Sequence, residues 1–240
     1  MQGRAGYGAT TEGTWPYSYD TSDLGTFPNQ TTRDGTPSAA ATGGYDGSSL
    51  SFLPGQRLSA CTCPNSDHPG PSASAGRGVP EIDILEAVVN IAKSTGQVSQ
   101  TFQIAPYNAG YQPDNSTDAT TIFNDTITAI NSYKGGQFQQ AVSALSDIDS
   151  KNYNNAGYTT YGCEWWSDPN DRDAGYLVWY SQGDPSWKIT TKTIGPDDEA
   201  MIGQRLIPEE PMASTLLFYM KATSNKDSHP VPYPQPRHVT

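Results

Sequence analysis

Short runs of β-branched and aromatic residues, bounded by Gly, Pro, Asn or Asp, recur along the second half of the chain. Runs of this length and composition are typical of β-strands. We predict strands at residues 79–92, 97–105, 157–166, 175–182 and 187–193. Residues 121–150 are ambiguous, because Val142, Leu145 and Ile148 recur with a weakly helical spacing whereas the Thr-rich flanks favour strands.

Residues 1–78 contain many turn-forming residues and show no sustained period, so we predict a long loop-like region. The whole chain has 23 Gly, 19 Pro, 14 Tyr and 5 Trp, with few Leu and Met. This composition suits an antiparallel all-β sandwich with long loops better than a helical bundle.

A net charge of −11 argues against nucleic acid as a partner, since binding to phosphates requires clustered Lys and Arg. The negative charge does not argue against a neutral ligand, and carbohydrate is the obvious class of neutral ligand for an acidic, aromatic-rich protein. No run of 18 apolar residues is present, so no transmembrane segment is predicted.

Three N-glycosylation sequons begin at Asn29, Asn115 and Asn124, which is a mild indication of the secretory pathway. The N-terminus lacks the apolar core of a signal peptide, so we expect the chain to be incomplete.

The three cysteines are Cys61, Cys63 and Cys163. The first two are too close together for the usual zinc spacing, and no paired His lies nearby. Two interpretations stay open: one disulfide between Cys163 and either of the other two, or three free thiols. No metal site and no cofactor are predicted.

The segment PEIDILEA places Glu81, Asp83 and Glu86 in an otherwise apolar predicted strand. Side chains alternate between faces, so Glu81 and Asp83 point the same way and Glu86 points the opposite way. One extra residue, a β-bulge near Ile84–Leu85, would bring all three acids onto one face.

Three acids on one face have three candidate meanings. A solvated strand face is the simplest, and a calcium site is less typical because its ligands usually come from a loop. Glycoside hydrolysis needs two carboxyl groups with different pKa values. Asp83 would lie between Glu81 and Glu86 and would keep their proton affinities apart.

The run EIDILE matches the E-x-D-x-x-E signature of glycoside hydrolase family 16 in its bulged, laminarinase-like form. Over residues 3–212 the chain resembles the fungal β-glucan synthesis-associated proteins of that family. The blocks that carry the resemblance are WPYSYDTSDLGTFPNQT, SLSFLPGQRLSACTCPNSDHPGP, GRGVPEIDILEA, YGCEWWSDP and QRLIPEEPM.

The resemblance implies a concanavalin-like (jelly-roll) sandwich with a cleft on its concave face. It implies a glycosidase that acts on β-1,3- or β-1,6-glucan of the fungal cell wall by a retaining mechanism, through hydrolysis or transglycosylation. Glu81 would be the nucleophile, Asp83 its support, and Glu86 the general acid and base. The alternatives are a non-catalytic glucan-binding or scaffolding protein and an inactive fragment.

Aromatic side chains line carbohydrate clefts because flat rings pack on the apolar faces of sugars. The candidates for such contacts are Trp15, Trp165, Trp166 and Trp179, each with a core position as its alternative. Trp165 and Trp166 should face opposite sides, so at most one of them reaches the sugar. Glu164 is expected to be structural.

The chain departs from the family pattern in three respects. We expect a partial family domain over residues 1–212 that starts late, and a proline-rich tail outside the family at residues 213–240. Ser22 stands where the family commonly has Cys. The expected location is the secretory pathway or cell surface, with membrane association only through an anchored region that this chain lacks.

Overall fold

The computed structural model describes eight segments of the chain, and every structural statement below concerns these segments alone. They are residues 2–3, 80–104, 112–134, 140–152, 155–168, 170–196, 205–208 and 212–213.

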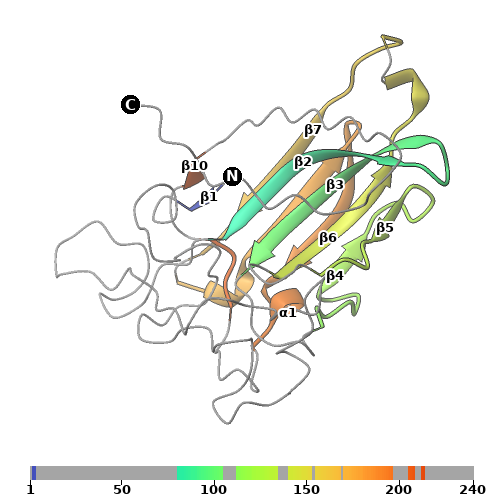
Figure 1. Cartoon of the computed structure of the whole chain (residues 1–240). Helices are drawn as coiled ribbons and strands as arrows, with labels where there is room; N and C mark the ends of the chain where they lie inside the picture. Colours follow the sequence, from blue (N-terminus) through green and yellow to red (C-terminus); the bar gives the residue numbers. More distant parts are fainter. Residues whose placement is uncertain are drawn as a thin grey trace, which may run out of the picture.

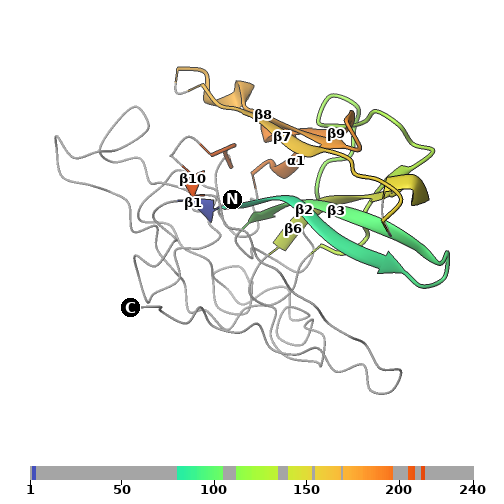
Figure 2. The ribbon, with the colours of Figure 1, turned by 90° about the horizontal axis from the view of Figure 1, so that it is seen from above.

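The described strands form two antiparallel sheets that lie face to face, as Figures 1 and 2 show. The six-stranded sheet has the order β10-β1-β2-β3-β6-β5, and the four-stranded sheet has the order β4-β9-β8-β7. The strands of the first sheet are β1 (Gln2–Gly3), β2 (Glu81–Asn90), β3 (Thr95–Ile104), β5 (Thr128–Ile130), β6 (Gln140–Asp147) and β10 (Met212–Ala213). Those of the second are β4 (Thr120–Ile122), β7 (Tyr161–Trp166), β8 (Tyr176–Ser181) and β9 (Asp184–Thr190). The predicted all-β antiparallel sandwich is confirmed.

Helical structure among the described residues is limited to three short turns. They are α1 (Thr191–Ile194) and two 3-10 turns, η3 (Ser150–Asn152) and η4 (Arg172–Ala174). Helix α1 replaces the end of the strand predicted at residues 187–193. A capping box between Thr190 and Thr193, in which each side chain accepts from the backbone N–H of the other, ends β9 and starts this turn.

The ambiguous region 121–150 contains three strands, β4, β5 and β6. The helical interpretation of Val142, Leu145 and Ile148 is therefore wrong. Strand β6 pairs with β3 on one side and β5 on the other, and these ladders decide its conformation. A weak three-residue recurrence is overridden by pairing of this kind because strand preference depends on neighbouring strands.

The hydrophobic core lies between the two sheets. The six-stranded sheet contributes Ile82, Phe102, Ile104, Val142 and Ala144, and the four-stranded sheet contributes Leu177, Trp179, Trp187 and Ile189. The rings of Trp179 and Trp187 stack with centroids 4.4 Å apart and an interplanar angle of 9°. Since Ile82 points inward, its neighbours Glu81 and Asp83 point to the outer face of the six-stranded sheet.

Candidate active site

The acidic strand β2 contains a bulge. Its residue Asp83 pairs with Thr101 of β3, and its next paired residue, Glu86, lies opposite Ser99. Two residues of β2, Ile84 and Leu85, therefore occupy the space opposite a single residue of β3. The bulge predicted from the sequence is confirmed at the predicted place.

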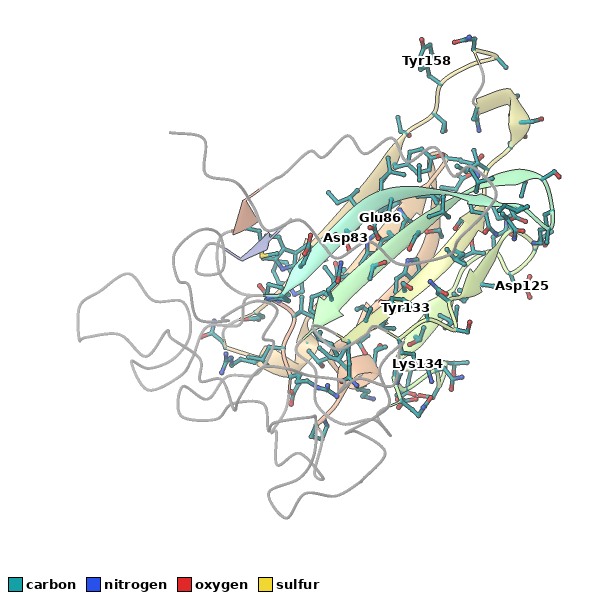
Figure 3. All side chains as sticks on the ribbon, viewed as in Figure 1. Asp83, Glu86, Asp125, Tyr133, Lys134 and Tyr158 are labelled. Atoms are coloured by element: carbon teal, nitrogen blue, oxygen red, sulfur yellow. The ribbon has the colours of Figure 1, made fainter. Side chains whose placement is uncertain are left out.

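The bulge brings the three acids onto one face. Glu81, Asp83 and Glu86 lie opposite Gln103, Thr101 and Ser99, respectively, which are alternate residues of β3 and share a face. We call these six residues the acid face; it is the side of the six-stranded sheet turned away from the four-stranded sheet. Figure 3 labels Asp83 and Glu86 on β2.

Polar side chains of β3 support the carboxyl groups. Gln103 donates from Nε2 to Asp83 Oδ2 at 2.6 Å, and the hydroxyl groups of Ser99 and Thr101 lie 3.1 Å apart. All three β3 side chains are buried. Buried polar groups of this kind are held by hydrogen bonds, so the carboxyl groups of the acid face lie in an ordered, polar environment.

Two of the carboxyl groups hold their protons more tightly than usual. Burial, followed by the negative charges of Glu81 and Glu86, raises the pKa of Asp83 well above its ordinary value, and the hydrogen bond from Gln103 partly opposes this. Part of the Glu86 side chain is exposed, yet burial around its carboxyl group and the charge of Glu81 raise its pKa too. Glu86 is therefore suited to donate a proton, as a general acid must.

Asp83→Asn is expected to flatten the dependence of the free energy of unfolding on pH. Because the folded pKa of Asp83 lies above the unfolded one, the folded chain binds more protons between the two values. The stability from protonated Asp83 is complete below about pH 4, the unfolded pKa, and is lost as pH rises through the folded pKa. Asparagine does not titrate, and its amide oxygen can still accept from Gln103. Urea unfolding at a series of pH values measures this, and equal slopes in both proteins would contradict it.

Tyr133 lies close to the acid face and was missed by the sequence reasoning. It follows β5, and its backbone N–H donates to Asn131 Oδ1 at 3.0 Å. Partial burial, followed by the negative charge of Glu86, raises the pKa of Tyr133. Figure 3 labels Tyr133 across the sheet from Asp83 and Glu86. No motif marked this tyrosine, because its proximity depends on the path of the chain after β5.

The described tryptophans do not lie on the acid face. Trp179 is fully buried in the core, and Trp165 packs against the core and donates from Nε1 to Pro208 O at 2.7 Å. Trp166 is 51% exposed, but it points outward from the four-stranded sheet. These three residues therefore do not line the acid face, and their contacts with sugar stay a prediction; Trp165 and Trp166 do face opposite sides. Trp15 lies outside the described residues.

Glu164 occupies the outer face of the four-stranded sheet, where its carboxylate accepts hydrogen bonds from two tyrosines. Tyr176 donates its hydroxyl at 2.6 Å and Tyr180 at 3.2 Å. These contacts tie β7 to β8 and agree with the structural role expected for Glu164.

Cys163 has a free thiol, so of the two interpretations left open by the sequence, the one with a disulfide at this residue does not hold. Its side chain packs against the core, and burial raises the pKa of the thiol to about 12. Cys61 and Cys63 lie outside the described residues. Within the described segments, no cluster of three or more His, Cys, Asp or Glu has the arrangement of a metal site. No helix there has the length and apolarity needed to cross a bilayer.

The family model for β-glucan synthesis-associated proteins SKN1/KRE6/Sbg1 matches residues 1–235. The chain belongs to this family. The match runs past residue 212, into the segment that we expected to lie outside the family.

Curated relatives come from fungi. The chain is 41% identical to β-glucan synthesis-associated protein KRE6 of Saccharomyces cerevisiae, over 89% of the chain and 27% of that relative. It is 41% identical to SKN1 of the same yeast, over 89% and 25%, and 39% identical to SKN1 of Candida albicans, over 90% and 26%. The chain thus spans about a quarter of the length of the curated relatives it matches. No solved structure matches it.

Proposed function

We propose that this member of the SKN1/KRE6/Sbg1 family acts on β-glucan as a retaining glycosidase. The observation that carries the proposal is the bulge in β2, which places Glu81, Asp83 and Glu86 on one face of the sheet. The acids of the E-x-D-x-x-E pattern are needed on one face because two carboxyl groups must flank a single glycosidic bond.

The reaction takes place in two steps. Glu86 donates its proton to the glycosidic oxygen while the Glu81 carboxylate attacks the anomeric carbon, so the bond to the departing sugar breaks and a glycosyl ester forms. Glu86, now ionised, then removes a proton from water or from a sugar hydroxyl, which attacks the same carbon and releases Glu81. Water gives hydrolysis and a sugar hydroxyl gives transglycosylation. Retention requires the two carboxyl groups to lie about 5–5.5 Å apart.

Asp83 supports this chemistry from its position between the two glutamates. Its raised pKa favours the neutral acid, which limits the repulsion among three neighbouring carboxyl groups. The hydrogen bond from Gln103 Nε2 fixes the orientation of its carboxyl group. A neutral carboxyl group can also donate a hydrogen bond, which an ionised one cannot.

The proposed substrate is β-1,3- or β-1,6-linked glucan of the fungal cell wall, and the proposed location is the secretory pathway or cell surface. A neutral polysaccharide agrees with the net charge of −11, which would repel nucleic acid. Relatives named as β-glucan synthesis-associated proteins favour transfer to a sugar acceptor over degradation.

Product analysis with end-labelled β-1,3- and β-1,6-gluco-oligosaccharides tests the proposal. We expect shorter products, or longer ones if a sugar is the acceptor, and the first products should carry the β-anomeric configuration. The α-anomer as first product, or no cleavage of either linkage, would overturn it.

A glucan-binding scaffold is the second candidate, because the names of the relatives associate them with synthesis and not with cleavage. It predicts that oligosaccharide binds and raises the melting temperature, since a ligand stabilises the state it binds. It also predicts that no bond is cleaved under the same conditions.

Glycosylation at Asn115 and Asn124 is expected if the chain passes through the secretory pathway. Both residues are exposed, and the Thr126 backbone N–H donates to Asn124 Oδ1 at 3.1 Å, so this sequon forms a surface turn. Produced in a secreting yeast, the Asn115→Gln and Asn124→Gln variants should each lose one glycan, seen as a smaller shift on endoglycosidase treatment.

Asn170→Gln is the matched control, because Asn170 is exposed but belongs to no sequon. A secreted chain that shows no shift beyond the one due to Asn29, which lies outside the described residues, would contradict the prediction.

A further inference from the structure

The four-stranded sheet has an irregularity of its own. In the pairing of β8 with β9, Trp179 lies opposite Trp187, but the next residue of β8, Tyr180, lies opposite Pro185. Ser186 is therefore an extra residue of β9, so among the described strands both sheets contain a bulge.

The side chain of Gln100 links the two bulges. Its Nε2 donates at 3.0 Å to the backbone carbonyl of Ile84, in the β2 bulge, and at 3.0 Å to that of Tyr180, the β8 residue beside the β9 bulge. Its Oε1 lies 2.8 Å from the Ser186 hydroxyl, which can donate to it. Both N–H groups and the carbonyl of this fully buried amide thus have partners, which fixes its orientation.

Trp179 holds the neighbouring carbonyl of the same bulge. Its Nε1 donates to the backbone carbonyl of Asp83 at 3.0 Å, and its ring is fixed by stacking on Trp187. A bulge disrupts the regular ladder of hydrogen bonds between strands, and buried carbonyls need replacement donors. Trp179 and Gln100 supply these donors from inside the sandwich.

We propose that Gln100 and Trp179 are positioning residues that hold the β2 bulge and thereby keep Glu86 on the acid face. In a regular ladder Leu85 would lie opposite Ser99, and Glu86 would lie opposite Val98, which is buried inside the sandwich. The catalytic consequence rests on the proposed function, whereas the placement of Glu86 can be tested without turnover.

The test compares Gln100→Met and Trp179→Phe with the wild-type chain. Methionine has a similar length and no amide, and phenylalanine keeps an aromatic ring but lacks the N–H. We expect kcat on a β-gluco-oligosaccharide to fall by about 10²-fold in each, because small misplacements of a reacting group have effects of this size. KM should change little, since the groups that bind the sugar stay in place.

The second readout is titration of the Glu86 carboxyl group by carbon-13 NMR. The titratable groups facing it among the described residues are Glu81 and Asp83 on β2 and Tyr133 after β5. With the bulge released and the ladder regular, Glu86 would turn away from Glu81 to the buried face opposite Val98, where burial should raise its pKa further. A lost structural hydrogen bond elsewhere would not produce this shift.

Thr128→Val provides the matched control. Thr128 shares a buried hydrogen bond of 2.8 Å with Ser146 between β5 and β6, away from both bulges. This variant loses one buried hydrogen bond, as Trp179→Phe does, but it should keep the wild-type kcat and the wild-type titration of Glu86.

Unchanged kcat and unchanged Glu86 titration in folded Gln100→Met and Trp179→Phe would overturn the inference. If the wild-type chain cleaves no glucan, the proposed function fails and the titration alone decides the placement of Glu86. If Gln100→Met does not fold, Trp179→Phe and Ser186→Ala decide it. Removal of the Ser186 hydroxyl should give a smaller shift in the same direction, and no shift in either variant would refute the role.

Discussion

Glu81→Gln is expected to reduce turnover of a β-gluco-oligosaccharide by about 10⁴- to 10⁶-fold, the range seen when one group of a cooperating catalytic set is removed. Glutamine has nearly the same shape, but its amide cannot form the glycosyl ester, so the first step fails. Binding of the sugar should persist. Initial rates from product chromatography and calorimetric binding measure the two effects separately.

Glu164→Gln is the matched control, because it changes the same functional group on the outer face of the opposite sheet. It should keep wild-type turnover, apart from the small effect of weakening its contacts with two tyrosines. If Glu81→Gln retained wild-type turnover, or if Glu164→Gln lost as much, the assignment of the nucleophile would be wrong.

Trp187→Ala should lower the free energy of unfolding by about 3–5 kcal/mol, the usual cost of truncating a buried tryptophan. Trp187 is fully buried and stacks on Trp179, so its removal leaves a cavity at the centre of the sandwich. Urea unfolding followed by circular dichroism measures the loss.

Trp187→Phe measures how much stability the aromatic ring contributes without the indole N–H. The indole N–H of Trp187 is buried and has no acceptor among the described residues, so its removal leaves no partner unsatisfied. The phenylalanine variant should therefore lose clearly less stability than the alanine variant. An alanine variant within about 1 kcal/mol of wild type, the ordinary effect of a point mutation, would contradict the proposed core.

The arrangement of the three acids could be predicted because it follows from local geometry. Alternation of side chains along a regular strand puts Glu86 on the opposite face from Glu81 and Asp83. A single inserted residue brings Glu86 onto their face. The structure has that insertion at Ile84 and Leu85. This inference needed no knowledge of the neighbouring strands.

The positions of the tryptophans could not be predicted in the same way. Alternation indicates that Trp165 and Trp166 face opposite sides, but it does not say which side is covered by the other sheet. The covered side depends on the packing of β7 and β8 against the six-stranded sheet, which buries Trp179 and partly buries Trp165. A tertiary arrangement decides this, so composition alone could not show that these tryptophans lie away from the acid face.

The support of the bulge was also invisible in the sequence. Gln100 and Tyr180 are 80 residues apart, and Asp83 and Trp179 are 96 residues apart. A glutamine in a strand gives no sign that its amide will hydrogen-bond to both sheets. A tryptophan close to tyrosines in the sequence is more readily interpreted as a sugar-binding residue. These contacts exist only because the two sheets pack face to face.

Covalent trapping tests the central claim most directly, the claim that Glu81 attacks a glucan on the acid face. The chain is incubated with a β-gluco-oligosaccharide that carries fluorine at C2 and an activated leaving group, and its peptides are analysed by mass spectrometry. We predict a glycosyl ester on the peptide that contains Glu81, and its absence from the Glu81→Gln variant. Sugar binding without any adduct, or an adduct on another carboxyl group, would contradict this account.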